Sequence, residues 1–483
     1  MVGWSDGRVT RRPPAAYAGA VAAEHFDDFM SDADALMWAI EQDPLLRSTI
    51  VTAIYLDTTP SWETVQAKLA RGVRLIPRMR QRVVEPAFGL GTPAWSDDPY
   101  FDLGYHVRRV RNPDPTTDHY VYNLAGRAAM EAFDRDRPLW EYTLVEDLPG
   151  GRAAFVMKVH HSMTDGVGGI KLLLMLLDLE RDPPPAAPDP EPRPLPIFTP
   201  MAVALHRLAI QRHIVQQALQ QAAPTAWTLA GDLRHNALGM LGGGVAMIAS
   251  AARFLAPAPV PESALLRPRS LGRRVFSLDL PLDDVKHAAK AVGASLNDVF
   301  VGGVMGGLQR YHEERGMAPD QLRMIMPINV RSDRGGLGGN HFTPARVMMP
   351  AALTDPVARI EEISRRCRHM RAEPAVAMTE QLATVLNLLP RKAATAVMGS
   401  MFKGADLVTS NIPGAPFPLY LGGAEIQQIY AFGPLSGTAT NVTLLSHAGT
   451  CCIGVNVDTA AIPDPDELRR HLRGGFAEVL ALV

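Results

Sequence analysis

The chain has 483 residues. This is too long for a single hydrophobic core, so we expect two domains and a connecting segment. Hydrophobic residues make up 47% and charged residues 20%, a composition that excludes disorder over most of the length. The 48 basic residues balance 50 acidic ones, so no net field draws the chain to nucleic acid or to an anionic membrane, and any membrane contact must be local and apolar.

The cysteines and the apolar segments indicate the cellular compartment of the protein. Cys367, Cys451 and Cys452 can form neither a disulfide framework nor a four-ligand zinc site, which is typical of a reducing environment. No segment offers the ~20 continuous apolar residues of a membrane-spanning helix. Pro13 and Pro14 interrupt the basic and Ala-rich N-terminus, so we do not interpret it as a secretion signal. We therefore expect a cytoplasmic protein.

The first predicted elements alternate between helix and strand. Ser31 precedes an apolar run that extends to Glu41, a pattern that predicts a capped helix. The β-branched run from Ile50 to Leu56 predicts a strand, and similar alternation continues to about Leu179. These elements form a predicted N-terminal domain, residues 1–182.

A linker and a bridge follow this first domain. Residues 183–200 are dense in proline, and the residues up to 255 are rich in Ala, Leu and Gln, so we take 183–270 as a helical bridge. Within it, the apolar segment Ala237–Ala252 fits either a helix packed between domains or one lying in a membrane interface, and its low burial per residue favours the first. Strand and helix patterns then resume in a C-terminal domain, residues 271–483.

The densest group of reactive side chains lies at a predicted strand-to-helix turn. The runs Trp140–Val145 and Ala153–His160 predict a hairpin around Pro149-Gly150-Gly151. The hairpin ends in His160-His161-Ser162-Met163-Thr164-Asp165-Gly166, and the apolar run Val167–Leu179 predicts a buried helix after it.

Histidine suits an alcohol nucleophile. A neutral imidazole with an unperturbed pKa of ~6.5 can take a hydroxyl proton at pH 7. Because neighbouring strand residues point to opposite faces, only one of His160 and His161 can face a given channel. Metal ligation by the two histidines with Asp165 is possible by residue type, but that divergence disfavours it. The string lacks the Gly-x-Ser-x-Gly of a serine hydrolase, while a buried, satisfied histidine pair is the structural alternative.

Several motifs together resemble one family. The pattern His160-His161-x-x-x-Asp165-Gly166 resembles the signature of the bacterial wax ester synthase/diacylglycerol acyltransferase family, within the CoA-dependent acyltransferases related to chloramphenicol acetyltransferase. Pro138-Leu139-Trp140 and Asn297-Asp298 look like that family's PLW and ND motifs, and the likeness runs from about Ser31 to Val457. The sequence departs at Ala415-Pro416, where related sequences have proline directly after the preceding glycine.

The resemblance implies an α/β (α+β) fold of two chloramphenicol acetyltransferase-like domains joined by a helical linker, with the active site in the channel between them. It implies that His161 is the general base and that His160 packs behind it. Asp165 is expected first to hold the loop, with direct polarisation of the base as the alternative. Gly166 would keep the channel open beside the base, although a left-handed turn would also explain a glycine there.

The ND motif supplies the remaining candidates. Asn297 and Asp298 lie at the start of a predicted helix and are expected beside the channel, with Asn297 our first candidate for a polar group near the reacting centre. Helix capping by Asn297 is compatible with that role. Weaker candidates are Ser436, Thr438 and Asn441.

The implied reaction is transfer of a long-chain acyl group from acyl-CoA to diacylglycerol, which makes triacylglycerol. Wax ester synthesis from a long-chain fatty alcohol is the alternative, because each buried CH₂ contributes ~0.8 kcal/mol and one apolar tunnel could take either acceptor. Acyl-CoA is a substrate, so no cofactor is expected.

The implied substrates also indicate the binding partners and the location of the protein. They imply a peripheral position at a membrane or lipid-droplet surface and no nucleic-acid partner, while the sequence does not specify an oligomeric state. A noncatalytic lipid-binding protein is disfavoured by the intact motif. A peptide synthetase condensation domain shares a similar motif but normally accompanies carrier domains, for which this chain has no room.

Overall fold

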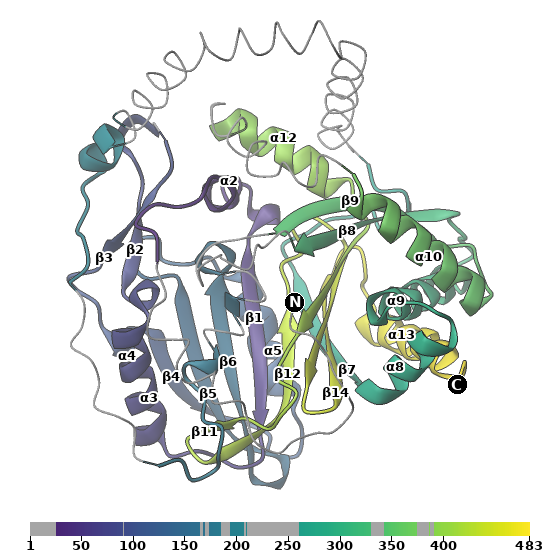
Figure 1. The fold of residues 1–483 in the computed structure, drawn as a ribbon, viewed down its shortest axis with the longest axis horizontal. Coiled ribbons are helices and arrows are strands. Elements are labelled where there is room, and N and C mark those ends of the chain that lie inside the picture. Colours follow the sequence, from purple (N-terminus) through teal and green to yellow (C-terminus); the bar gives the residue numbers. More distant parts are fainter. Residues whose placement is uncertain are drawn as a thin grey trace, which may run out of the picture.

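The structure is a computed structural model, and it describes residues 26–89, 91–164, 168–169, 173–184, 194–206, 209, 260–329, 342–373, 386 and 391–483. Two six-stranded sheets stand side by side, each backed by its own helices (Figure 1). This arrangement gives the mixed α/β architecture that the sequence predicts.

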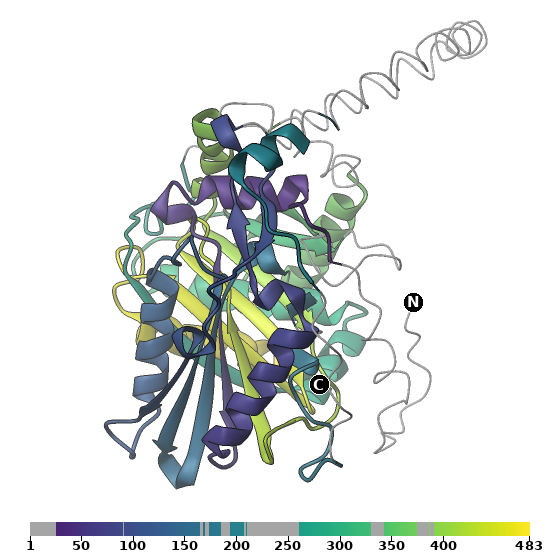
Figure 2. The same cartoon turned by 90° about the vertical axis from the view of Figure 1, so that its left-hand side faces the viewer.

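The first sheet has the strand order β11-β12-β1-β6-β5-β4, and its pairs are antiparallel except for β4 with β5. Its two faces are buried by different helices. Val51, Ala53 and Tyr55 of β1 pack toward α5, while Ile54 and Leu56 pack toward α3. Figure 2 looks onto the second side and shows α3 in front of the sheet.

The bounds of these elements are as follows. The strands are β1 (Thr49–Leu56), β4 (Val107–Arg111), β5 (Trp140–Leu148), β6 (Arg152–His160), β11 (Tyr420–Leu421) and β12 (Ala424–Phe432), with β2 (Gln81–Val84) and β3 (Ala94–Asp97) in a separate small sheet. The helices are α2 (Asp32–Ile40), α3 (Trp62–Leu75), α4 (Leu103–His106) and α5 (His119–Met130), with 3₁₀ turns η1 (Pro44–Leu46), η2 (Pro77–Met79), η3 (Ala87–Gly89), η4 (Pro149–Gly151) and η5 (His161–Met163).

Strand β12 comes from the C-terminal part of the chain but belongs to the first sheet. It pairs with β1 in antiparallel register, with Ala53 opposite Tyr430, and so covers a strand edge that would otherwise be open. The division into 1–182, 183–270 and 271–483 stays a prediction for the domains. The first sheet, however, contains β12, which comes from the predicted C-terminal domain.

The second sheet has the order β7-β14-β13-β10-β8-β9 and is covered by α8, α9, α10 and α13 (Figure 1). The contact between α9 and α13 depends on glycine, because a Cβ on Gly475 of α13 would lie 2.3 Å from the backbone of Gly303 and Gly307 in α9. Its elements are β7 (Arg273–Pro281), α8 (Leu282–Ala291), α9 (Leu296–Glu313), β8 (Gln321–Asn329), β9 (Phe342–Pro350), α10 (Pro356–Arg371), α12 (Arg391–Lys403), β10 (Leu407–Pro413), β13 (Thr440–His447), β14 (Thr450–Asp458) and α13 (Pro465–Leu480).

The two sheets meet where β12 passes β13 and β14. A Cβ on Gly454 would lie 2.2 Å from the carbonyl oxygen of Ala431, so the backbones are in direct contact there. The Asn456 side chain donates to the carbonyl of Gly433 at 3.0 Å and so holds the segment that follows β12. The two sheets are therefore in contact along β12 of the first sheet and β13 and β14 of the second.

The structure confirms several local predictions and corrects one. The predicted N-terminal helix is α2, capped by the Ser31 hydroxyl, and the predicted hairpin is β5 and β6. The helix expected to reach Leu179 ends earlier, because Asp178 forms a backbone bridge with Tyr420 of β11. Most of the predicted bridge, including Ala237–Ala252, lies outside the described residues.

The described helices were compared with the length and apolarity that a membrane span needs. No single one of them meets both requirements. The consecutive helices α8 and α9, bent by 96° at their junction, meet them together by length and composition only.

Candidate active site

The two histidines of the motif stand where β6 ends and turns into η5. His160 is the last strand residue, and its backbone N–H donates to the carbonyl of Leu139 at 3.0 Å. His161 begins the 3₁₀ turn, and its N–H donates to the carbonyl of Ser48 at 2.8 Å. The start of β1 therefore holds the turn, and the change of backbone direction separates the two imidazoles.

His160 is completely buried and held on both sides of its ring. Its Nδ1 accepts from the backbone N–H of Ser162 at 3.1 Å and lies 2.7 Å from that residue's hydroxyl. Its Nε2 lies 3.0 Å from Oε1 of Glu41, at the end of α2. Because Nδ1 is an acceptor, the ring proton is placed on Nε2. Trp38 and Phe133 complete the enclosure with edge-on ring contacts.

Glu41 joins this network to the start of β1. Its Oε1 also accepts from the backbone N–H of Ser48 at 2.7 Å. Burial acts to raise the pKa of Glu41, but His160, the Ser48 amide and Arg135 outweigh it and leave the pKa below its usual value. Glu41 is thus a charged acceptor that ties α2, β1 and η5 together.

His161 is only half-buried. Met163 and Thr164, two and three residues after it in the sequence, line an apolar cavity. The cavity encloses about 810 Å³ between its lining atoms, a volume that includes space open to solvent. Met163 and Thr164 line it beside the motif, and Ile412 and Leu445 line it from the other half. The remaining lining residues are Ile50, Thr52, Ile76, Met79, Tyr142, Met157, Val159, Gly169, Leu173, Leu176 and Ala431. His161 itself is not among the lining residues.

The other members of the motif, Asp165 and Gly166, lie outside the described residues. Their expected roles in holding the loop and in keeping the channel open stay predictions. The same holds for the assignment of His161 as base.

The ND motif lies at the first turn of α9. Ser295, and not Asn297, is the N-cap, because its hydroxyl accepts from the Asp298 N–H at 3.2 Å while Asp298 accepts from the Ser295 N–H at 3.1 Å. The alternative of helix capping by Asn297 is therefore wrong. Asn297 lies within 3.7 Å of the sulfur of Met326, and its role near the reacting centre stays a prediction.

In two of the weaker candidates, Thr438 and Asn441, the side chain donates a hydrogen bond to a nearby backbone carbonyl. The Thr438 hydroxyl donates to the carbonyl of Leu435 at 2.7 Å, and Asn441 donates to the carbonyl of Pro434 at 2.8 Å. Ser436 has a left-handed backbone with a φ of 48°. These contacts give the segment a structural function at the junction of the sheets.

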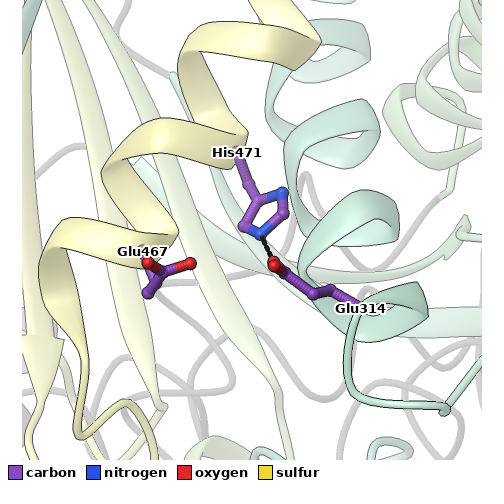
Figure 3. Close-up of side chains that lie close together, drawn as sticks. All are labelled: Glu314, Glu467 and His471. Atoms are coloured by element: carbon purple, nitrogen blue, oxygen red, sulfur yellow. Dashed lines mark hydrogen bonds and ion pairs between the residues drawn. The ribbon is translucent and has the colours of Figure 1, made fainter.

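A second group of chemically active side chains lies between α9 and α13. Ligand atoms of Glu314, Glu467 and His471 lie within 4.8 Å of one another, and Figure 3 shows the His471 ring directed at Glu314. The Arg470 guanidinium donates to both carboxylates, at 2.8 Å and 2.6 Å. Because Arg470 pairs with both glutamates and offsets part of their charge, we interpret the group as an ion-pair network that joins the helices.

Family models match almost the whole chain. The model of the wax ester synthase/diacylglycerol acyltransferase catalytic domain matches residues 30–300, and the model of the C-terminal domain of the same family matches residues 338–479. A Mycobacterium tuberculosis protein that carries the name of a diacylglycerol O-acyltransferase is 37% identical over 457 residues, which are 94% of this chain and 92% of the relative. Another protein so named from that bacterium is 27% identical and covers 89% of this chain and 90% of its own length.

Solved structures share the fold at lower identity. The wax ester synthase/diacylglycerol acyltransferase from Marinobacter aquaeolei VT8 superposes with a TM-score of 0.62 at 20% identity, over 93% of this chain and 98% of that one. The first condensation domain of the calcium-dependent antibiotic synthetase gives 0.57 at 16% identity, over 95% and 97%. A starter condensation domain of rhizomide synthetase in complex with C8-CoA and Leu-SNAC gives 0.53 at 15%, over 97% and 96%. These likenesses confirm the expected CoA-dependent acyltransferase fold.

Proposed function

The chain belongs to the wax ester synthase/diacylglycerol acyltransferase family, and from this premise we propose that it makes triacylglycerol by transferring a long-chain acyl group from acyl-CoA to diacylglycerol, with His161 as general base. One observation carries the assignment of the base. His160 is locked in the core by Glu41 and Ser162, whereas His161 is half-buried at the start of the turn whose next residues, Met163 and Thr164, line an apolar cavity.

The reaction follows from ordinary base catalysis. His161 takes the proton of the acceptor hydroxyl, and the oxygen attacks the thioester carbonyl carbon. The tetrahedral oxyanion collapses, the carbon–sulfur bond breaks, and the CoA thiolate receives the proton from His161. A positioned base contributes ~10²- to 10⁴-fold, so the remaining acceleration comes from positioning and from stabilisation of the oxyanion.

The cavity supports a long-chain substrate. Its lining is almost entirely aliphatic and aromatic, with methionine side chains that adapt to a flexible chain. Each CH₂ that a substrate buries there contributes ~0.8 kcal/mol, so a fatty chain gains several kcal/mol from the cavity alone.

Peripheral contact with a membrane or lipid-droplet surface is part of the proposal. Phe88 at the tip of the β2–β3 hairpin is 85% exposed, and Met201 and Leu205 on the helical segment 200–206 are about half exposed. Val203 of that segment packs on β2 and β3, so these apolar side chains belong to one subassembly. We expect the protein to float with diacylglycerol-containing liposomes and Phe88→Ser to weaken this binding roughly tenfold, since burying a Phe is worth ~1.5–3 kcal/mol. Equal flotation of both proteins would contradict this surface assignment.

The test of the reaction uses product identity. Purified protein is incubated with radiolabelled palmitoyl-CoA and either dioleoylglycerol or hexadecanol, and the lipids are separated by thin-layer chromatography. We expect labelled triacylglycerol. Wax ester alone would favour the alcohol acceptor, and no labelled product with either acceptor would favour a noncatalytic lipid-binding protein.

A further inference from the structure

One wall of the cavity contains a row of side chains that crosses four strands. Thr52 of β1 is paired with Ala431 of β12 on one side and with Met157 of β6 on the other, and Met157 is paired with Tyr142 of β5. All four residues line the cavity. Directly opposed strand residues project from the same face, so Tyr142 and Thr52 present hydroxyl-bearing side chains on either side of Met157. With about 4.8 Å between strands, their Cα atoms are about 10 Å apart.

Tyr142 is the more deeply placed of the two. Its side chain is 5% exposed, and its ring is held by Trp140 at 4.7 Å and Phe155 at 5.4 Å between centroids. Across the described part of the chain, no hydrogen bond satisfies its hydroxyl, whereas the hydroxyls of Tyr122 and Tyr430 are bonded to Ser277 and to Asp279. Burial raises the pKa of Tyr142, so the phenol stays protonated and offers a donor to the cavity.

A hydrocarbon chain cannot satisfy this donor. A buried phenol facing only methylene groups carries the cost of a lost hydrogen bond, and an ester carbonyl removes that cost. Diacylglycerol has two ester carbonyls a few bonds from its reacting hydroxyl. A fatty alcohol has no polar group beyond the hydroxyl that reacts.

The position of Tyr142 relative to the motif fits an acceptor of that size. Met157, its partner across the strands, precedes His161 by four residues, which is about 13 Å along the strand. The imidazole, the glycerol backbone and the phenol fill this interval. The reacting hydroxyl then lies toward η5 and the esters lie deeper in the cavity.

We propose that the hydroxyl of Tyr142 donates a hydrogen bond to an ester carbonyl of diacylglycerol and thereby selects a glyceride over a fatty alcohol as acceptor. Tyr142 is then a specificity-determining residue of the acyl transfer. This inference rests on the proposed function.

The experiment isolates the ester carbonyls. Purified full-length protein is assayed with palmitoyl-CoA and three acceptors: 1,2-dioleoylglycerol, its diether analogue 1,2-di-O-oleylglycerol, which lacks the carbonyls, and hexadecanol. We expect kcat/KM for the diester to exceed that for the diether about tenfold in the wild type, the effect of one buried hydrogen bond. Tyr142→Phe should abolish this preference and leave the diether and hexadecanol rates within about twofold of the wild type.

Tyr55→Phe is the matched control. Tyr55 is buried on the opposite face of the same sheet, its hydroxyl also lacks a described partner, and it does not line the cavity, so all three rates should stay at wild-type values. If Tyr142→Phe keeps the diester preference, or lowers all three rates equally, the inference is overturned. If the wild type makes no triacylglycerol, the proposed function fails and this inference fails with it.

Discussion

Replacement of Glu41 by glutamine tests how the motif is held in place. The substitution keeps the size of the side chain but removes the charge that faces His160 Nε2 at 3.0 Å and the Ser48 amide at 2.7 Å. A hydrogen bond to a charged group contributes ~1.5–3 kcal/mol, and the Glu41 side chain is only 15% exposed, so solvent screens it little. For a unit of 150–250 residues, each kcal/mol shifts the melting temperature by ~2–4 °C. We expect Glu41→Gln to lower Tm by roughly 5 °C.

The pH dependence gives an independent check. The pKa of Glu41 in the folded protein lies below the ordinary glutamate value of ~4.3, so its stabilising effect is fully present above that pH. The effect is lost as the pH falls through the lower folded pKa. The difference in Tm between wild type and Glu41→Gln should therefore be largest near neutral pH and should vanish in strong acid.

The assay is thermal unfolding followed by circular dichroism between pH 3 and pH 7. Glu361→Gln, on the exposed face of α10, is the control and should shift Tm little. If Glu41→Gln melts together with this control at pH 7, the network around His160 does not hold the motif as described.

Two further perturbations test the packing of the C-terminal half. Gly475→Ala should lower Tm steeply, because its Cβ would lie 2.3 Å from two backbone atoms of α9. Gly474→Ala is the control and should melt at or above the wild-type temperature, because the nearest neighbour of its Cβ is the Arg310 side chain at 3.5 Å. Equal melting temperatures of the two variants would contradict the close helix contact. Arg359→Ala should lower the free energy of unfolding by ~3–5 kcal/mol in denaturant, because Arg359 is buried and bonded to Glu478 at 2.9 Å and to the carbonyl of Gly302 at 3.1 Å. A loss below about 1 kcal/mol would contradict a stabilising role for these contacts.

Local patterns in the sequence identified the elements that carry the site. The hairpin of β5 and β6, the capped helix α2 and the turn that bears the two histidines were all predictable, because each depends on residues close together in the chain. The strand pattern of Trp140–Val145 could not tell that Tyr142 faces a cavity, because the opposite wall comes from Ile412 and Leu445.

Long-range pairings account for what was missed. The partner of His160 is Glu41, a residue 119 positions earlier whose only local signal is its place at the end of an apolar helix. The insertion of β12 beside β1 left no trace in the local pattern of either strand. The same recruitment explains the early end of the helix before Asp178, which pairs with Tyr420 of the adjoining strand β11.

The most direct test of the account is the rate of palmitoyl transfer from palmitoyl-CoA to dioleoylglycerol by His161→Ala under single-turnover conditions. Removal of the base should slow transfer by ~10²- to 10⁴-fold, while Tm stays at the wild-type value. His287→Ala, an exposed histidine on α8, should transfer at the wild-type rate. A His161→Ala protein that transfers the acyl group within about threefold of the wild-type rate would contradict the claim that this imidazole is the base.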